Sequence, residues 1–374
     1  SSAAVGRAIR SRKMARSSGP ISVTRALVSG NTESQSAASA DHTRSHRDVI
    51  VDFHNHYYPP PYLDAIKAGG LKVKMDYDAE GNPRPHYPGH YNILVPGHRD
   101  LDFREEVLDE HGVTHQVLTF TTPGVHYEEP ATAVRLARIV NDAFAAEVSR
   151  RKHFSALATL PLNDPRASVV ELERAVRELG LRGAMVFSNV NGTGLDEPAY
   201  MPLWERANEL GAVIYIHPAH PVGVEAMEKY WLMPLVGFLM DTTLAAGKLV
   251  FSGIVERFPR ITWVLTHMGG AVPYLAERMD RGYEAFAECR ANITQKPSDY
   301  LKRFYYDTVN FDNAAQRLAI EFAGVDHIVA GSDYPHQIGS IPRMLSSIRA
   351  LSLTDAERAK ILGRNAARLL RLSA

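Results

Sequence analysis

The sequence predicts an α/β protein built as a (β/α)8 (TIM) barrel, and three observations lead to this prediction. Short apolar runs rich in β-branched residues alternate with amphipathic helical patterns from Asp48 onward, which is typical of β–α units that form a parallel sheet. Eight such runs occur within residues 48–374, the number that a closed barrel needs. Polar residues follow several runs directly, at the strand ends where barrels carry their chemistry. A doubly wound open sheet is the alternative, but no glycine-rich phosphate loop follows any run.

The eight candidate strands are short and begin with the run VIVDFH. In chain order they span 49–54, 114–120, 155–160, 183–187, 212–217, 262–267, 304–309 and 327–332. Helical patterns lie between them, for example over 130–151 and 164–180. The second pattern begins with Asp164 as an N-cap before a proline and ends at Gly180, as expected for a helix. A further helix is expected after Pro234, and its apolar face fits either the core or a dimer surface.

One insertion stands out between the first strand and the first barrel helix. Residues 57–100 are rich in proline and tyrosine and contain a DAEGNP turn. Such length over a barrel mouth predicts a lid that shapes the substrate pocket and excludes water. Its histidines, His86, His90 and His98, are expected at the surface, because loop histidines between prolines are more often exposed than bound to a metal. Together with the aromatic stretch 225–238, the lid favours an apolar pocket that accommodates a ring.

Residues 1–47 differ in composition from the rest of the chain. They are rich in Ser, Ala and Arg and contain no acidic residue before Glu33. Little in this segment repays the entropy of ordering, so a disordered extension is expected before a single barrel domain at 48–374. The composition is typical of an organelle transit peptide. An upstream extension or a cloning remnant fits equally well.

The bulk composition excludes several classes of partner. Lys+Arg and Asp+Glu both number 42, so no net charge attracts nucleic acid or an anionic membrane. No apolar run approaches the roughly 18 residues that a membrane span needs. A lone cysteine, Cys289, excludes an intrachain disulfide and fits a reducing compartment. A cytoplasmic location is therefore expected, with organelle import if residues 1–47 are a transit peptide.

Candidate metal ligands stand at the ends of the predicted strands. His54 and His56 close the first run, and the two-residue period of a strand places them on one side. Three further polar residues follow later runs in the same way, namely His217, His267 and Asp333. Each of these alone fits a buried, hydrogen-bonded histidine or a helix-capping aspartate. Together they form a ligand set suited to Zn²⁺, with Mn²⁺ or Fe²⁺ as alternatives. Asp52 is a candidate to orient a ligand ring.

The motifs resemble a known family over residues 48–372. HNH at 54–56, the YIHP segment, GIVERFPRITWVLTHMGGAVPYLAERMD at 253–280 and GSDYPH at 331–336 are similar to the amidohydrolase superfamily. More narrowly, they resemble the aminocarboxymuconate-semialdehyde decarboxylase family.

The resemblance implies one metal ion per subunit, usually zinc and sometimes manganese, and it implies the residues that hold it: His54, His56, His217 and Asp333. His267 matches the catalytic histidine of the family. Arg278 matches an arginine that binds the substrate carboxylate across a dimer interface, which implies a homodimer. A solvated helix charge is the alternative for Arg278.

Two departures from the family pattern bear on the chemistry. The fourth strand ends in GAMVFSN without the lysine that bridges two metals in other branches, which favours a single ion. A second substrate arginine of the semialdehyde decarboxylases falls on Phe286.

The expected activity is non-oxidative decarboxylation of a hydroxylated aromatic or muconate-like carboxylic acid, with His267 and Asp333 moving the proton. The alternatives are a metal-dependent hydrolase of a lactone, amide or C–C bond and a non-catalytic metal-binding barrel.

Overall fold

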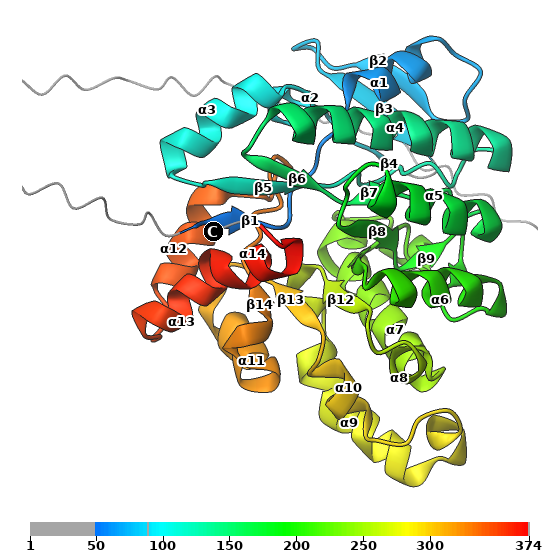
Figure 1. Cartoon of the computed structure of the whole chain (residues 1–374), viewed down its shortest axis with the longest axis vertical. Coiled ribbons are helices and arrows are strands. Elements are labelled where there is room, and N and C mark those ends of the chain that lie inside the picture. The colour runs from blue at the N-terminus through cyan, green and yellow to red at the C-terminus, as the bar shows by residue number, and fades with distance from the viewer. Residues whose placement is uncertain (1–48, 88–89, 373–374) are drawn as a thin grey trace, which may run out of the picture. The chain divides into compact units, whose positions relative to one another are not determined.

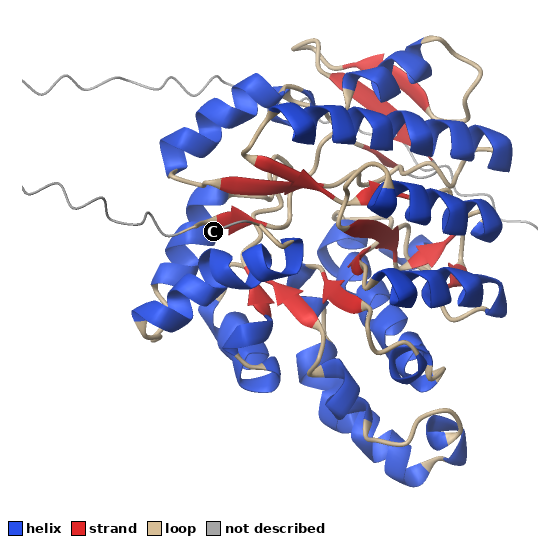
Figure 2. Cartoon of the chain, in the orientation of Figure 1, coloured by secondary structure: helices blue, strands red, loops and turns tan. Residues whose placement is uncertain are grey.

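The computed structural model of the protein describes residues 49–87 and 90–372. The expectations for the extension at 1–47 lie outside these ranges and stay predictions. The described residues form one compact unit, in which strands lie inside a layer of helices (Figures 1 and 2).

The strands form the predicted (β/α)8 barrel. In order around it they are β1 (Val51–Asp52), β5 (His115–Leu118), β6 (Phe154–Ala156) continued by β7 (Ala158–Thr159), β8 (Gly183–Phe187), β11 (Val213–His217), β12 (Thr262–Leu265), β13 (Tyr305–Asp307) and β14 (Ile328–Val329). All neighbours pair in parallel. The ring closes between the first and last strands, because Phe53 N donates to Ala330 O at 2.8 Å and Asn55 bridges Tyr334. Each of the eight predicted runs supplies one position in the barrel.

The strands are buried on both faces, which explains why the sequence reads as continuous apolar runs there. At the start of β8, Gly183 has a φ of 151°, and a Cβ on it would lie 1.9 Å from Val213 O of β11. Only glycine therefore allows the two strands to approach this closely.

Helices follow the strands and cover the barrel. They are α3 (Leu101–His111), α4 (Pro130–Arg150), α5 (Pro165–Arg177), α6 (Met201–Leu210), α7 (Phe238–Phe251), α8 (Ile254–Arg257), α9 (Val272–Ala285), α10 (Pro297–Leu301), α11 (Asn313–Ala323), α12 (Ile341–Arg349), α13 (Asp355–Ala359) and α14 (Asn365–Leu370). The N-cap prediction for α5 is confirmed, since the Asp164 side chain accepts from Ala167 N at 3.0 Å. The helix expected after Pro234 begins as a π-helical turn, η3 (Met233–Gly237), before α7.

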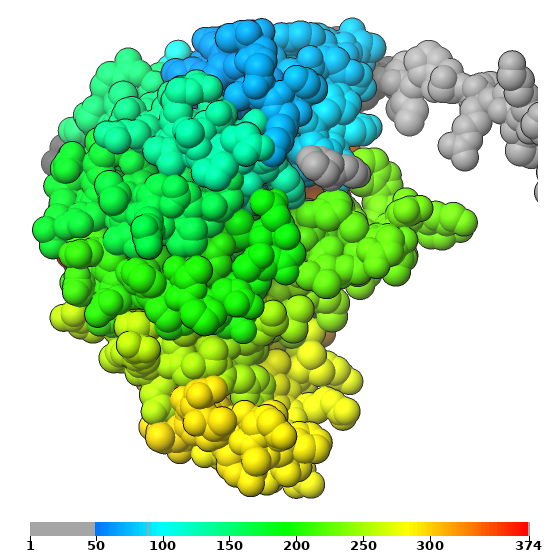
Figure 3. Space-filling model, turned by 90° about the vertical axis from the view of Figure 1, so that its right-hand side faces the viewer, coloured from blue at the N-terminus to red at the C-terminus, as the bar shows by residue number. Residues whose placement is uncertain are grey.

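The insertion at 57–100 has its own secondary structure. It contains α1 (Pro60–Lys67), a three-stranded antiparallel sheet of β2 (Lys74–Tyr77), β3 (Pro83–Tyr87) and β4 (His90–Tyr91), and α2 (Pro96–Arg99). The insertion meets the segment before α7, where the rings of His90 and Trp231 lie 5.2 Å apart (Figure 3). The expectation that His98 is a surface residue is wrong, because it is 1% exposed.

One expectation about apolar runs also needs correction. Residues Met233–Phe251 form a helix of 19 residues with a mean hydropathy of 1.3, long and apolar enough by length and composition to cross a membrane. Asp241 and Lys248 interrupt the run, so a search for unbroken apolar sequence misses it. Buried helices of soluble proteins pass the same test, and the Asp241 side chain is buried against the barrel.

Candidate metal centre

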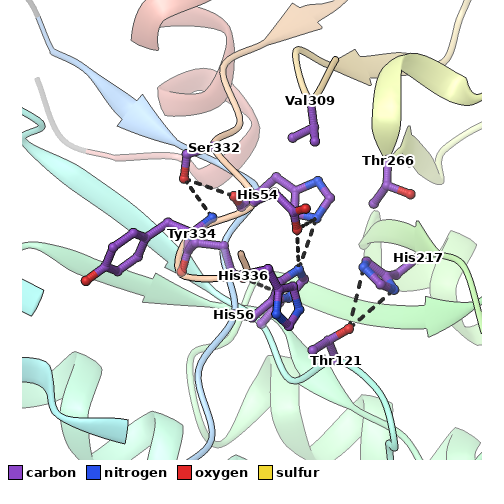
Figure 4. Close-up of polar contacts among 12 residues, drawn as sticks. His54, His56, Thr121, His217, Thr266, Val309, Ser332, Tyr334 and His336 are labelled. Atoms are coloured by element: carbon purple, nitrogen blue, oxygen red, sulfur yellow. Dashed lines mark hydrogen bonds and ion pairs between the residues drawn. The ribbon is translucent and has the colours of Figure 1, made fainter. Parts of the chain in front are cut away.

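Five polar side chains predicted from strand ends meet at the carboxyl end of the barrel, in two groups of three that share His54. Figure 4 shows three of them, His54, His56 and His217. His54 and His56 follow β1, His217 is the last residue of β11, His267 follows β12 and Asp333 follows β14. All five are buried. The structure thus brings together every residue of the predicted cluster.

The distances within the cluster suit a metal ion. His54 Nε2 lies 3.2 Å from His56 Nε2 and 3.4 Å from Asp333 Oδ1, and His56 Nε2 lies 3.0 Å from the same oxygen. Ligand atoms about 2.0–2.2 Å from one ion lie roughly 3.0–3.6 Å from each other. His54, His217 and His267 form a second group whose ligand atoms lie within 4.8 Å of one another. The residues present therefore fit a divalent cation.

His217 is held so that one ring nitrogen faces the cluster. Its Nδ1 donates to Pro218 O at 2.8 Å, and its ring centroid lies 5.0 Å from that of His56. A backbone acceptor on Nδ1 leaves Nε2 without its proton and available to a metal. Thr121 Oγ1 lies 3.4 Å from Nδ1 and supports the same ring.

Asp307, the last residue of β13, is a site residue that the sequence analysis missed. Its Oδ2 lies 2.6 Å from His54 Nδ1 and accepts from Tyr215 Oη at 2.8 Å. The prediction that Asp52 orients this ring is wrong, because the Asp52 carboxylate accepts from Gln116 Nε2 at 2.7 Å instead. The strand-end rule passed over Asp307 because the predicted run at 304–309 extends two residues beyond it, whereas β13 ends at Asp307.

The carboxylates determine the charge of His54. Burial lowers the pKa of His54, but Asp307 and Asp333 outweigh that effect and raise it to about 10. Burial likewise acts to raise the pKa of Asp333, yet its hydrogen bonds with His54 and His56 hold that pKa well below its usual range. Without an ion, His54 therefore carries a proton that a metal has to displace.

The other imidazoles are neutral. Burial holds the pKa values of His56 and His217 well below the ordinary histidine range. Burial, aided by the nearby charge on His54, lowers the pKa of His267 to about 4. Neutral imidazoles are the form that binds metals or accepts a proton. His267 and Asp333 also have positive φ values, 53° and 58°, a backbone strain that is common at functional sites.

Two more histidines adjoin the cluster. His98 Nε2, from the insertion, lies 3.2 Å from His336 Nδ1, and the His336 ring lies 4.6 Å from that of His56. No periodic pattern marked either residue. Arg278, in contrast, lies exposed on α9 and has no hydrogen bond or ion pair to any residue of the cluster.

The fold and the site together define the class: a (β/α)8 barrel with a histidine–aspartate cluster suited to a metal at the carboxyl ends of its strands. The sequence model of the amidohydrolase family matches residues 51–372, and the chain belongs to this family.

Known relatives within this family include several decarboxylases. The chain is 32% identical over 335 residues to the 2-amino-3-carboxymuconate-6-semialdehyde decarboxylase of Dictyostelium discoideum, covering 87% of this chain and 92% of that protein. The crystal structure of 5-carboxyvanillate decarboxylase from Sphingomonas paucimobilis has a TM-score of 0.77 and 28% identity, over 87% of this chain and all of that one. A dihydroxybenzoic acid decarboxylase from Polaromonas, solved with bound manganese and an inhibitor, has a TM-score of 0.74 and 27% identity, over 87% and 97% of the two chains. The predicted resemblance is confirmed.

Proposed function

We propose that the protein is a metal-dependent, non-oxidative decarboxylase that removes CO₂ from a hydroxylated aromatic or muconate-like carboxylic acid. One observation carries this proposal: a chain related over 87% of its length to a decarboxylase gathers a buried histidine–aspartate cluster at the barrel mouth. The names of the other two relatives also describe decarboxylases of substituted aromatic acids.

Loss of CO₂ leaves an electron pair on carbon, so the reaction needs an electron acceptor next to that carbon. A divalent ion bound at the cluster would supply this acceptor by polarising a hydroxyl or enol oxygen of the substrate. The residues proposed to hold the ion are His54, His56, His217 and Asp333. Asp307 would orient the His54 ring by accepting a hydrogen bond from Nδ1, the nitrogen that does not bind the ion.

The carbon that loses CO₂ must gain a proton, and His267 is the proposed carrier. Its ring is neutral at pH 7, and its buried Nδ1 has no hydrogen-bond partner among the described residues. The ring can therefore take a proton from the substrate hydroxyl and pass it to carbon, with Asp333 assisting as a second acceptor. General acid–base transfer of this kind is typically worth ~10²–10⁴ in rate.

We infer one ion per subunit, Mn²⁺ or Zn²⁺. The end of β8 carries Phe187, Ser188 and Asn189 rather than a bridging lysine, and Ser188 already donates to Asp241. Imidazole and carboxylate ligands suit both metals, and manganese is bound in the Polaromonas relative.

Elemental analysis of the purified protein, followed by a screen of salicylate-type and muconate-type acids, tests the proposal. We expect one equivalent of a divalent metal and release of CO₂ with the ring substituents retained. Net uptake of water without CO₂ would identify a hydrolase instead. A protein without a stoichiometric ion would remove the basis of the proposed mechanism.

We further propose a homodimer in which Arg278 serves the site of the partner subunit. Arg278 is exposed and makes no contact with the cluster of its own subunit among the described residues. Met240 and Leu244 on α7 and Tyr274 on α9 are large apolar side chains exposed at 45%, 49% and 77%. A groove of about 600 Å³ lies between α7 and α9. A second copy of the chain would cover this apolar face.

Subunit mixing tests the shared site. Arg278→Gln and His267→Asn should each be nearly inactive alone. Equal mixing after unfolding and refolding should restore about a quarter of wild-type activity, because half of the dimers then contain one intact composite site. An arginine acting within its own subunit predicts no restoration. A monomer in analytical ultracentrifugation would overturn the dimer.

A further inference from the structure

Arg104 of α3 is a fully buried cation that donates hydrogen bonds only to neutral oxygen atoms among the described residues. Its guanidinium makes five hydrogen bonds, to the carbonyls of His56 and Gly97 and to the side-chain oxygens of Asn55 and Gln116. None of these acceptors is a carboxylate. The carboxylate of Asp52 is linked to Arg104 only indirectly, because Gln116 accepts from Arg104 and donates to Asp52. A buried arginine without a directly bonded counter-ion is rare, because burial of a charge is costly.

One side of the guanidinium is hydrogen-bonded to the turn that carries two proposed metal ligands, His54 and His56. Arg104 Nη1 donates to Asn55 Oδ1 at 2.6 Å, and Nη2 donates to the carbonyl of His56. Asn55 faces away from the cluster, since strand alternation separates it from His54 and His56. Its own amide donates to Val117 O at 3.1 Å. These bonds hold the backbone between the two imidazoles.

The other side of the guanidinium is hydrogen-bonded to the base of the insertion, residues 94–100. Arg104 Nε donates to Gly97 O at 3.0 Å. The neighbouring residue, His98, lies 3.2 Å from His336 on the turn of Asp333. The Tyr334 ring of the same turn lies 5.2 Å from the guanidinium carbon. Gly97 packs so tightly that a Cβ on it would lie 2.3 Å from the Tyr334 hydroxyl.

Stability alone does not account for this arrangement. Replacing a buried charge by an apolar side chain of similar volume is often neutral or stabilising. Arg104 instead bonds directly both to the turn of His54 and His56 and to Gly97 of the insertion. A planar group with five donors in a fixed fork can fix two chain segments at once, which an ammonium cannot.

We propose that Arg104 is a positioning residue that couples metal occupancy to the ordering of residues 94–100, the base of the insertion. The inference rests on the proposed metal centre. When the ion fixes His56 and its turn, the shared guanidinium restrains Gly97 and the segment around it. The segment that borders the site then becomes ordered only in the metal-loaded protein.

Hydrogen exchange measured by mass spectrometry tests this coupling on the full chain. In wild type, saturating Mn²⁺ or Zn²⁺ should slow amide exchange in residues 94–100 by at least about 5-fold, the lower end of typical coupling between sites. In Arg104→Lys, which keeps the charge but loses the fork, the slowing should vanish at metal concentrations that saturate the protein. Arg99→Lys is the matched control, because Arg99 bonds only within the insertion, to Leu94 O, and it should behave as wild type.

A second variant keeps the test valid if Arg104→Lys fails to fold. Asn55→Ser leaves the arginine in place but removes its anchor on the ligand turn, and it should also lose the metal-induced slowing. Metal content is measured directly for every variant. Wild type that binds no ion would overturn both the proposed function and the coupling. Variants that bind metal and still show the wild-type slowing would overturn the coupling alone.

Discussion

Asp307 determines how tightly the cluster can bind an ion, because it fixes the ring and the basicity of His54 through a 2.6 Å contact. Asp307→Asn should lower metal affinity about 10–100-fold, the usual effect of removing a carboxylate behind a ligating histidine. Chelator competition measures this affinity. Asp326→Asn, at a half-exposed carboxylate paired with Lys360, is the control. Equal affinities in the two variants would remove Asp307 from the proposed site.

His267 should be separable from metal binding. His267→Asn removes the proposed proton carrier but none of the four proposed ligands, so turnover should fall by ~10²–10⁴. Metal content should stay at the wild-type value. A variant with normal turnover would show that another group moves the proton.

His126 should make the protein sensitive to acid. It is 1% exposed, neither ring nitrogen has a partner among the described residues, and burial lowers its pKa to about 3. In the unfolded chain a histidine binds a proton near pH 6.5, whereas in the folded chain His126 binds one only near pH 3. Stability therefore falls as the pH drops through this window, by up to ~1.36 kcal/mol per pH unit. His126→Phe should unfold in urea with a shallower dependence between pH 6.5 and 5, and parallel curves would contradict this.

At the residue scale, a site residue can be predicted from sequence where chain order decides its position. His217 and Asp333 follow apolar runs, and the barrel brings such positions together whatever their separation in sequence. The partner of a side chain cannot be predicted where it depends on which neighbour the side chain meets after folding. Alternation along β1 gives the side on which Asp52 lies but not that Gln116, rather than His54, reaches its carboxylate.

Among the elements, α7 secures the loops that follow β8 and β11. The buried carboxylate of Asp241 accepts from Asn189 Nδ2 at 2.7 Å and from the Ser188 hydroxyl, and Ser188 N donates to His217 O at 2.8 Å. Asp241→Ala should therefore cost about 1–3 kcal/mol, the penalty for leaving buried donors unpaired. Urea unfolding measures this loss.

Val170→Ala, at a side chain of α5 that is 64% exposed and lies outside the proposed dimer face, serves as the control and should change stability by less than about 0.5 kcal/mol. If Asp241→Ala loses no more stability than the control variant, the loops after β8 and β11 do not depend on α7.

The elements differ in how well local sequence predicts them. The start of α5 was predictable because Asp164 and its proline satisfy the cap locally. The sheet of the insertion was not, because its strands are short, contain prolines and pair only through contacts such as Lys74 with His86. The start of α7 was predicted a few residues early, since no local signal marks the π-helical turn that precedes it.

The whole molecule should be stabilised by its ion. Because the metal binds the folded cluster and not the unfolded chain, stability should rise by RT ln(1 + [L]/Kd), about 2.7 kcal/mol at a hundredfold excess over Kd. Dialysis against a chelator should lower the thermal midpoint, and added Mn²⁺ or Zn²⁺ should restore it in a concentration-dependent way. Mg²⁺, which prefers oxygen ligands, is the control. An unchanged midpoint would argue against a bound ion.

At the scale of the whole molecule, eight alternating apolar runs predicted the barrel, and four motifs, among them HNH, the segment 253–280 and GSDYPH, predicted its family. They could not predict how the insertion packs, because His98, Arg104 and Tyr334 meet only after the chain has folded. Nor could they place Arg278, whose predicted partner belongs to another subunit.

The pairing of Phe53 with Ala330 has a consequence for biogenesis. The first and last strands adjoin, and the proposed ligands follow both, so the ligand set is incomplete until Asp333 has been synthesised. A nascent chain that ends before Asp333 would carry His54 and His56 without it. Loading with the metal would then be a late maturation step, and a product terminated before Asp333 would lack a complete site.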